Sequence, residues 1–526
     1  MAELSCVKKF ALSVLSAFVM LQTPLGAEEP SLYDVRSQDW RNGGIVYQIF
    51  VDRFAPSERL ESKRSLYAPP RRLKPWREVP SKGPYIESSQ VWSHEVDYWG
   101  GDLASVQSKL DYLQELGVEV VYLNPIFESL TYHKYDASDY HKVDPVYGNR
   151  AELKALTSEL HRRGMKLMLD GVFNHMGRRS PRFQEATASA PGSAERDFFL
   201  WNKDGTAVGW ADVDNLPELN LENSTVREYL YEGEQSVVQS YLKNEGIDGW
   251  RLDVAFDLGL EYLSALTRQA HKTKPGSAVI GEIWNYPAEW YPSVDGVMNM
   301  HGRTILLALL QGRVAPEHAS RMWQTMMDDS GYDHMLKAWL VLDNHDTPRL
   351  NHILPEEWQV RMARTLQFTL PGSVWLYYGS ELGMEGGDDP ENRAPMRWDL
   401  ADEHNTTLQL HRRLLEFRKN SRSLRVGDFR RLDSGKTFAF LRTTDRAAET
   451  VLVLANPTDQ PVKEFLQVPD GRLHDLTVMK PAFGPSLEAK ILAGTLQVEI
   501  PAHEVVVLIP DTRPMPKGYN RYYRTR

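Results

Sequence analysis

Three carboxylates, Asp253, Glu282 and Asp346, each stand at the end of a short apolar run. Carboxylates beside an apolar core must be paired, hydrogen-bonded or functional. Cleavage of an acetal uses such a set. One carboxylic acid must protonate the leaving oxygen, and a carboxylate must stabilise the positive charge that develops on the other face of the sugar ring. The spacing therefore predicts a site that breaks glycosidic bonds.

The neighbours of these carboxylates indicate how the roles divide. Arg251 lies two residues before Asp253, so both side chains point to the same side of a strand and the guanidinium would keep Asp253 ionised as a nucleophile. Glu282 follows apolar residues, and partial desolvation suits a general acid. His345, next to Asp346, is placed to hydrogen-bond sugar hydroxyls. Each carboxylate alone is also compatible with a salt bridge at a strand end; the three together favour a site.

Short apolar runs alternate with helix-length amphipathic segments from Gly44 to about Asn420. This pattern predicts an α/β fold, a closed (β/α)8 TIM barrel with the helices outside. A doubly wound open sheet is the alternative, but the polar residues follow the carboxyl ends of the strands, where barrel enzymes place their active sites. Strands are expected at residues 45–50, 118–123, 166–172, 249–254, 278–283, 296–300, 338–342 and 373–378, and helices at 103–116, 151–163, 225–244, 260–272, 356–370 and 406–420.

The alternation of strands and helices in the catalytic region, residues 28–425, is interrupted by a long irregular segment at about 174–222. This segment is rich in Gly, Pro, Arg and aromatic residues. We expect it to be a loop domain inserted after strand three that roofs one side of the site. Residues 426–512 contain closely spaced strands that predict a C-terminal antiparallel β-sandwich. Residues 513–526 are basic and predict a loose tail.

The first residues have the pattern of an export signal. Lys8 and Lys9 precede an apolar run at residues 10–21, and small residues follow up to Ala27. This predicts a signal peptide over residues 1–27 and an exported protein, periplasmic or extracellular. The run is too short to span a bilayer, so no membrane anchor is expected. The single cysteine, Cys6, would leave with the signal, and core burial alone would then stabilise the mature chain.

Composition excludes some classes of partner. The chain has 526 residues, 42% hydrophobic and 25% charged, with a formal net charge of −10. A nucleic-acid partner would require a basic stripe, whereas neutral sugars are indifferent to this charge. The 14 Trp and 23 Tyr residues provide rings on which sugars can stack. The composition leaves the oligomeric state open.

Four segments in order resemble the four sequence regions of the α-amylase superfamily: 170–175 (DGVFNH), 249–255 (GWRLDVA), 281–284 (GEIW) and 343–349 (DNHDTPR). The resemblance implies a TIM barrel, a loop domain after strand three and a C-terminal sandwich. It makes Asp253 the nucleophile, Glu282 the acid/base and Asp346 the third carboxylate. It also implies the following sugar-binding and supporting residues: Arg251, His175 and His345 around the reacting ring, and Asp170 behind it.

Within that superfamily the chain is most similar to the neopullulanase/cyclomaltodextrinase branch. The similarity is carried by segments 98–103 (YWGGDL), 122–128 (YLNPIFE), 133–136 (HKYD), 216–220 (LPELN) and 386–393 (GGDDPENR). It implies that Tyr135 is a platform for the sugar at the cleavage point, and that Asp389 and Arg393 hold the next sugar on the non-reducing side. Simple packing of Tyr135 and a local salt bridge between Asp389 and Arg393 are the alternatives.

The sequence departs from the branch in several places. Such proteins commonly carry an extra N-terminal β-domain, but the stretch between the predicted cleavage point and the first expected strand at Ile45 is short, so we expect no such domain here. After Asp52 it reads APSERL at residues 55–60, without the Asn/Asp-rich calcium loop. Gly100 and Asp102 alone offer too few oxygens, so we expect no required metal or cofactor. Residues 254–257 (VAFD) lack the Lys-His pair of typical endo-acting α-amylases, which favours short or branched maltodextrins.

The sequence thus predicts an exported retaining α-glucan hydrolase that cleaves α-1,4 bonds in maltooligosaccharides, cyclodextrins, pullulan or starch, with α-1,6 bonds as a further candidate. A glycosyl-transferring enzyme with the same machinery is the nearest alternative, because the partition depends on how well the acceptor side excludes water. A non-catalytic carbohydrate-binding protein on the same fold would be expected to lack a carboxylate, and all three are present. Barrel chemistries based on a Schiff-base lysine or clustered histidine ligands have no matching pattern.

Overall fold

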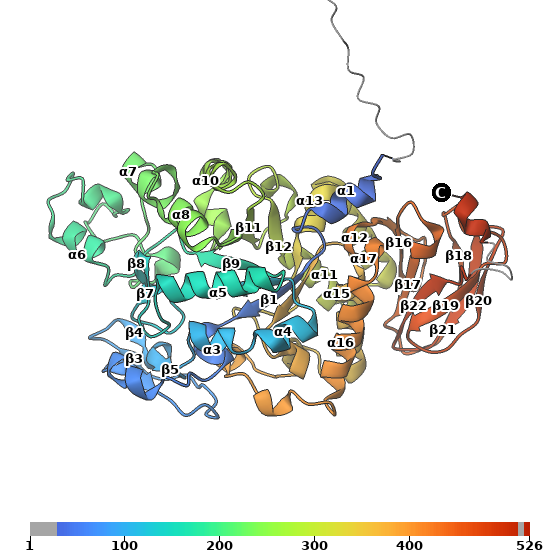
Figure 1. The fold of residues 1–526 in the computed structure, drawn as a ribbon, viewed down its shortest axis with the longest axis horizontal. Helices are drawn as coiled ribbons and strands as arrows, with labels where there is room; N and C mark the ends of the chain where they lie inside the picture. The colour runs from blue at the N-terminus through green and yellow to red at the C-terminus, as the bar shows by residue number, and fades with distance from the viewer. Residues whose placement is uncertain (1–28, 514–519, 526) are drawn as a thin grey trace, which may run out of the picture.

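The computed structural model describes residues 29–513 and 520–525, so the predicted signal peptide lies outside the described residues. Eight parallel strands pair in chain order, and the last, β14, pairs with the first, β1, to close a barrel (Figure 1). The predicted TIM barrel is confirmed and the doubly wound sheet is excluded. The barrel strands are β1 (Ile45–Ile49), β6 (Val120–Leu123), β9 (Lys166–Gly171), β10 (Gly249–Leu252), β11 (Ala278–Ile283), β12 (Gly296–Asn299), β13 (Trp339–Leu340) and β14 (Ser373–Tyr377).

The interior of the barrel is packed with side chains from its strands. Trp339 and Trp375 lie with ring centroids 5.2 Å apart, and Tyr122 packs 5.4 Å from Trp375. Around them lie Val46, Met168, Ile280 and other buried residues. This layer fills the middle of the barrel, so a ligand can be reached only at the ends of the strands.

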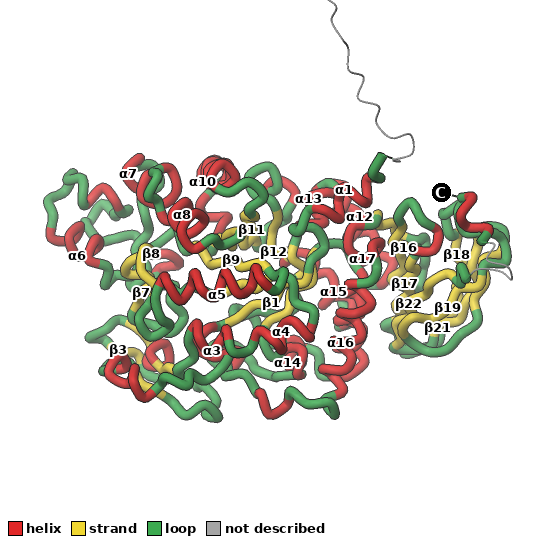
Figure 2. Tube along the Cα trace, viewed as in Figure 1, coloured by secondary structure: helices red, strands yellow, loops and turns green. Residues whose placement is uncertain are grey.

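Helices surround the barrel, as the red segments in Figure 2 show. The predicted helix at 103–116 is broken at Ser108, the one at 225–244 contains two π-helical turns, and two helices between Met300 and Ser330 were not predicted. The outer helices are α3 (Leu103–Gln107), α4 (Leu110–Leu116), α5 (Arg150–Arg162), α7 (Ser224–Arg227), α8 (Val237–Ser240), α10 (Leu260–Thr273), α11 (Met300–Leu310), α12 (Pro316–Ser330), α13 (Tyr332–Lys337), α15 (Glu357–Thr369) and α16 (Thr406–Lys419).

Three long connections leave the barrel at one end of the molecule, on the left in Figure 1. The first, between β1 and α3, contains β2 (Arg72–Leu73), the hairpin β3 (Tyr85–Ile86) and β4 (Val91–Trp92), and β5 (Asp97–Tyr98). The second contains the hairpin β7 (Phe127–Ser129) and β8 (Ala137–Val143). The third follows β9, contains α6 (Pro181–Ala188), and is the loop domain expected after strand three.

The C-terminal domain is an antiparallel sheet of eight strands with its own core, in agreement with the predicted fold class. Its strands are β15 (Asp428–Arg431), β16 (Phe438–Thr443), β17 (Val451–Asn456), β18 (Val462–Gln467), β19 (Val478–Phe483), β20 (Ala489–Leu492), β21 (Thr495–Ile500) and β22 (Glu504–Pro510). It packs on the barrel through α17 (Arg422–Val426), α12 and α15.

The prediction of a loose tail is wrong for residues 520–525. Tyr522 is only 7% exposed, and its hydroxyl lies 2.7 Å from the Thr477 hydroxyl. The ring therefore belongs to the core of the C-terminal domain. Among the described residues, none of the helices combines the length and apolar character needed to cross a bilayer.

Candidate active site

Strand register brings the two main carboxylates together. In the ladder between β10 and β11, Leu252 is paired with Gly281, so Asp253 and Glu282 each follow one residue later at the barrel rim. Neighbouring strands lie about 4.8 Å apart, and side chains at matched positions share that spacing. The next strand on the other side, β9, pairs Asp170 with Arg251.

Arg251 is fully buried and holds these carboxylates. Its Nη1 donates to Asp170 at 2.8 Å and to Asp253 Oδ1 at 2.9 Å. Its Nη2 lies 2.9 Å from Glu282 Oε2. One guanidinium thus fixes three acidic side chains from three adjacent strands, and it supplies the counter-charge that the sequence analysis assigned to Asp253 alone.

The backbone after Asp253 is bent to reach Glu282. Val254 has φ of 39°, which is rare for a β-branched residue, and its N–H donates to Glu282 Oε2 at 2.8 Å. The indole of Trp284 donates to Glu282 Oε1 at 3.1 Å. Strained backbone beside reacting groups is common in active sites, where surrounding contacts hold it. The Val254 N–H and the Trp284 indole thereby fix the orientation of both Glu282 oxygens.

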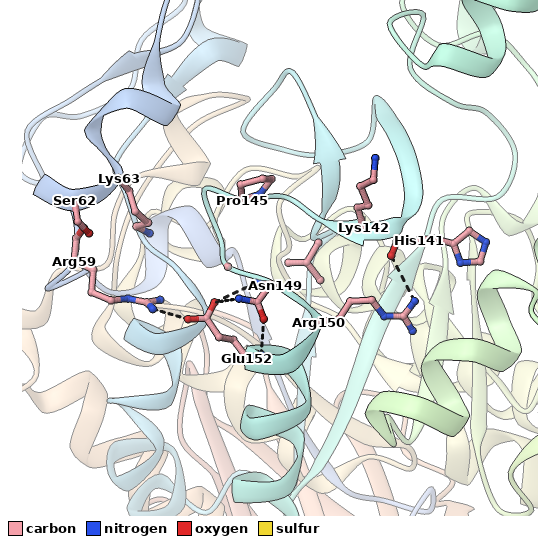
Figure 3. A pocket seen from close by; sticks show the side chains of 11 residues that line it. Arg59, Ser62, Lys63, His141, Lys142, Pro145, Asn149, Arg150 and Glu152 are labelled. Atoms are coloured by element: carbon pink, nitrogen blue, oxygen red, sulfur yellow. Dashed lines mark hydrogen bonds and ion pairs between the residues drawn. The ribbon is translucent and has the colours of Figure 1, made fainter.

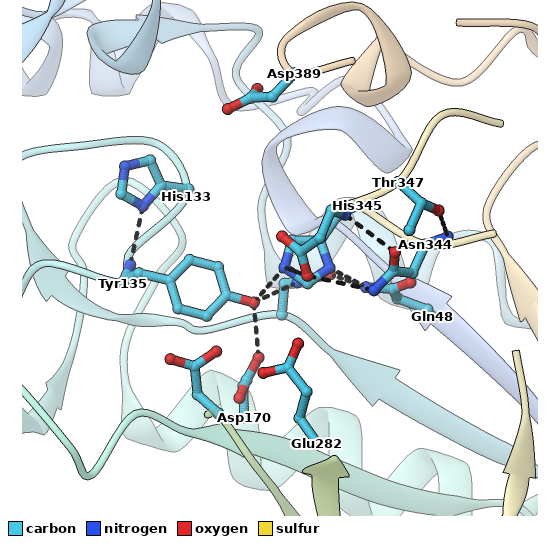
Figure 4. A network of polar contacts seen from close by, with 12 residues as sticks. Gln48, His133, Tyr135, Asp170, Glu282, Asn344, His345, Thr347 and Asp389 are labelled. Carbon is cyan, nitrogen blue, oxygen red and sulfur yellow. Dashed lines mark hydrogen bonds and ion pairs between the residues drawn. The ribbon is translucent and has the colours of Figure 1, made fainter. Parts of the chain in front are cut away.

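A second polar network connects the third carboxylate to the ring platform (Figure 4). His345 Nε2 lies 2.6 Å from the Tyr135 hydroxyl and 3.2 Å from Asp346 Oδ2. On its other side, Nδ1 lies 2.9 Å from the side-chain nitrogen of Gln48. The Tyr135 hydroxyl also donates to Asp170 at 3.0 Å, so this network meets the Arg251 cluster. The rings of Tyr135 and His345 are nearly parallel, with an interplanar angle of 3°.

Asp389 and Arg393 form an ion pair of 3.1 Å on the far side of Asp346. Arg393 is more than a local partner, because its Nη2 lies 3.4 Å from Asp346 Oδ1 and its Nε donates to the His345 carbonyl at 2.9 Å. It therefore links this pair to Asp346 and His345. Asp389 keeps 38% of its side chain exposed and can still accept hydrogen bonds from a ligand.

His175, at the end of β9, faces the loop domain. Its ring stacks on Trp210 with centroids 5.5 Å apart, and neither ring nitrogen has a hydrogen-bond partner among the described residues. Burial lowers the pKa of His175 to about 3, so the imidazole is neutral. A buried ring with a free donor and a free acceptor is suited to sugar hydroxyls.

Burial raises the pKa of two carboxylates in this cluster. Burial raises the pKa of Asp253, with Arg251 opposing and Glu282 adding to the rise. Burial and the neighbouring Glu282 raise the pKa of Asp346 to about 7. Like charges at this density cannot all ionise.

The expected absence of a calcium loop concerns Asp52 and Asp102, and both carboxylates are occupied by protein groups. Asp52 pairs with Arg53 at 2.8 Å and accepts the Gly100 N–H at 2.9 Å. Asp102 accepts from Lys63 Nζ at 2.7 Å and from Ser57 at 2.6 Å. A cation would have to displace these donors, so the residues do not fit a calcium site.

Lys63 also lines a cavity of about 570 Å³ between this loop and the start of α5 (Figure 3). Its other charged residues are satisfied within the protein. Arg59 pairs with Glu152, and Arg150 pairs with Glu245 from the helix behind. The first pair ties the first long connection to α5, and the second ties α5 to the segment that precedes β10.

The structure brings all ten residues predicted for the site to the carboxyl-terminal rim. They are joined in one network, apart from His175, whose ring contacts Trp210: Asp253, Glu282, Asp346, Arg251, Asp170, Tyr135, His345, Asp389 and Arg393. Tyr135 packs on His345 and leaves part of its ring exposed.

Sequence reasoning missed several residues of the site. Gln48 and Asn124 hold His345 and Tyr135 from the ends of β1 and β6, and Trp210 covers His175. Gln48 is a lone polar residue in an otherwise apolar strand, a pattern that could have identified it. Trp210 gives no such pattern, since it lies in an irregular loop.

A closed barrel with paired carboxylates at the rim, an arginine between them and ring platforms beside them defines a glycoside hydrolase. Comparison with known proteins identifies the family within this class. Residues 48–430 match the α-amylase catalytic domain model, and the chain belongs to the α-amylase family. It is a glucan hydrolase of the neopullulanase/cyclomaltodextrinase type.

Three relatives illustrate this type. Neopullulanase 2 of Thermoactinomyces vulgaris is 30% identical over 82% of this chain and 72% of its own. An intracellular maltogenic amylase of Bacillus subtilis is 32% identical over 78% of this chain and 68% of its own. The solved structure of a cyclomaltodextrinase, 27% identical, superposes with a TM-score of 0.74 over 90% of this chain and 79% of that one.

Proposed function

We propose that this chain hydrolyses α-1,4 bonds in short maltooligosaccharides, cyclodextrins and pullulan with retention of the anomeric configuration. The observation that carries the proposal is the matched position of Asp253 and Glu282 on neighbouring strands, both held by Arg251. Retaining enzymes need two carboxyl groups about 5 Å apart, which is the spacing of adjacent strands.

In the first step, an Asp253 oxygen attacks the anomeric carbon while Glu282 gives its proton to the leaving glycosidic oxygen. The bond to that oxygen breaks and a glycosyl ester forms on Asp253. In the second step Glu282 takes a proton from water, whose oxygen attacks the same carbon and releases Asp253. Each step passes through positive charge on the ring, which the ionised carboxylates in the cluster stabilise.

The remaining residues orient the sugar. Asp346 offers an acceptor to ring hydroxyls, and Tyr135 offers its face to the reacting sugar. His345 holds both of these side chains in position. Arg393 and Asp389 hold the sugar on the non-reducing side. On the opposite side Trp284, with 45% of its surface exposed, gives the leaving portion a ring to contact.

Product analysis on pullulan, γ-cyclodextrin and soluble starch tests the proposal. We expect panose from pullulan and rapid opening of cyclodextrin, both lost in Asp253→Asn. Cleavage of starch alone would assign the chain to long-chain amylolysis instead, and products larger than the substrates would assign it to glycosyl transfer. Activity that survives in Asp253→Asn would contradict the mechanism.

We further propose that no bound metal supports the fold, because protein donors occupy Asp52 and Asp102. Export is proposed on the sequence of residues 1–27 alone. Expression with a C-terminal tag, followed by N-terminal sequencing of the periplasmic and cytoplasmic fractions, tests it. An N-terminus at Glu28 outside the cytoplasm is expected, and full-length protein confined to the cytoplasm would contradict it.

A further inference from the structure

The hairpin β3–β4 presents an aromatic pair to solvent at the same end of the molecule as the active site. Tyr85 and Trp92 are directly opposite one another on the two strands, with ring centroids 5.3 Å apart and an interplanar angle of 70°. Trp92 is 50% exposed and Tyr85 37%. Exposed aromatic pairs of this size mark binding surfaces more often than single exposed residues do.

The hairpin is held rigidly although it is short. Val91, beside Trp92, is 2% exposed, and the Gln90 and Ser89 N–H groups both donate to the Ile86 carbonyl to close the turn. At the base, Ser93 N–H donates to the Pro84 carbonyl. The backbone that carries the two rings is therefore held in place, so little ordering of the hairpin is needed when a ligand binds.

Glu95 connects this pair to the catalytic centre. One carboxylate oxygen accepts the N–H of Trp92, and the other lies 3.5 Å from His133 Nε2. The Glu95 carbonyl accepts the Tyr132 N–H at 2.9 Å. His133 in turn stacks on Tyr135, with centroids 5.8 Å apart and an interplanar angle of 26°. A chain of direct contacts thus runs from the sugar platform to the hairpin.

The hairpin is also joined to the ion pair of Asp389 and Arg393, with His94 packed on Trp92 and Tyr132 bound to both members of the pair. The His94 ring stacks on Trp92 at 6.3 Å with an angle of 28°. Burial lowers the pKa of His94, while the Asp389 charge opposes this shift and the Arg393 charge adds to it. The Tyr132 hydroxyl donates to Asp389 at 3.3 Å and accepts from Arg393 at 3.2 Å, while its N–H donates to the Glu95 carbonyl. One residue therefore joins the ion pair to the base of the hairpin.

From this continuity we propose that Tyr85 and Trp92 form an additional sugar-binding platform for α-glucan chains longer than three glucose units, beyond the sugar held by Asp389 and Arg393. The proposal rests on the proposed function, since its ligand is the non-reducing end of a glucan already seated in the cleft. The platform would select for chain length without touching the reacting atoms.

Binding to the full-length Glu282→Gln protein tests this, because sugar then stays intact during calorimetry. Trp92→Ala added to that protein should weaken maltoheptaose binding about 5- to 10-fold, the effect of losing one stacking contact, and leave maltotriose binding unchanged. Trp92→Tyr should keep most of the affinity. Phe465→Ala is the matched control, because Phe465 is 71% exposed on β18 of the C-terminal domain.

Equal loss for maltotriose and maltoheptaose in Trp92→Ala would overturn the proposal, as would no loss for either. A change in sedimentation coefficient without a chain-length effect would overturn it too and assign the aromatic pair to contact with a second copy of the chain. If the wild-type protein binds maltoheptaose tightly but cleaves no glucan, the proposed function is contradicted. The proposal for Tyr85 and Trp92 is then still supported by the effect of chain length on binding.

Discussion

Replacing Arg251 by methionine removes the single guanidinium that three buried carboxylates share. The side chain is fully buried, and its two terminal nitrogens lie within 2.9 Å of Asp170, Asp253 and Glu282. A methionine fills similar volume, so lost packing is small and lost counter-charge dominates. Leaving a buried carboxylate without its partner costs about 3–5 kcal/mol.

The size of the effect must depend on pH. Without the guanidinium, one of the three buried carboxylates is expected to take up a proton in the native state of the variant. The carboxylates of the unfolded chain titrate near pH 4, so above that pH the native variant binds one proton more than the unfolded chain. Its free energy of unfolding then falls, relative to wild type, by about 1.4 kcal/mol for each pH unit above 4. Arg251→Met should therefore cost about 4 kcal/mol at pH 7 and about 1.4 kcal/mol at pH 5.

Urea unfolding followed by tryptophan fluorescence at both pH values measures this difference. Arg442→Met is the control, because that buried guanidinium binds the carbonyls of Thr369 and Gly427, not a carboxylate, and its loss should cost the same at either pH. Adding Asp170→Asn to Arg251→Met should recover about half of the loss at pH 7. Equal destabilisation at pH 5 and pH 7, or no recovery in the double variant, would refute the role of Arg251 as shared counter-charge.

Two further predictions concern the carboxylates. Because the pKa of Asp346 is raised to about 7, the native state holds that proton more tightly than the unfolded chain, and wild-type stability is lost as pH rises from about 4 to 7. Asp346→Asn should lower kcat at least about 100-fold. It should raise the free energy of unfolding at pH 8 by about 1 kcal/mol, a value reduced because the side chain is partly exposed, and leave it unchanged at pH 4. A lower free energy of unfolding at pH 8 would contradict this prediction. For the calcium-loop region, excess EDTA should shift the thermal midpoint by less than about 1 °C. A fall of several degrees, reversed by Ca²⁺, would show that a cation replaces Lys63 on Asp102.

The barrel and its carboxylates could be predicted because they depend on local patterns. All eight barrel strands are apolar runs bounded by polar residues, and α5 was placed within one residue of its observed ends. The functional side chains follow these runs directly, so placing a strand also places Asp253 or Glu282. The strand register then brings these side chains together, because the carboxyl ends of parallel strands in a closed barrel all lie at one rim.

What could not be predicted depends on long-range contacts or on uniform burial. The helix α11 is apolar on most of its surface because it lies between the barrel and other helices, so it has no clear period of 3.6 residues. Trp210 reaches His175 across an irregular loop. The hairpin carrying Tyr85 and Trp92 has strands of two residues each, too short for an alternating pattern.

The most direct test of the central claim is the anomeric form of the first product released from a maltooligosaccharide, followed by ¹H NMR before mutarotation. A covalent intermediate on Asp253 requires two inversions, so the account predicts the α-anomer first and no product from Asp253→Asn. The β-anomer as first product would mean that water attacks directly, and that Asp253 and Glu282 do not work as nucleophile and acid/base.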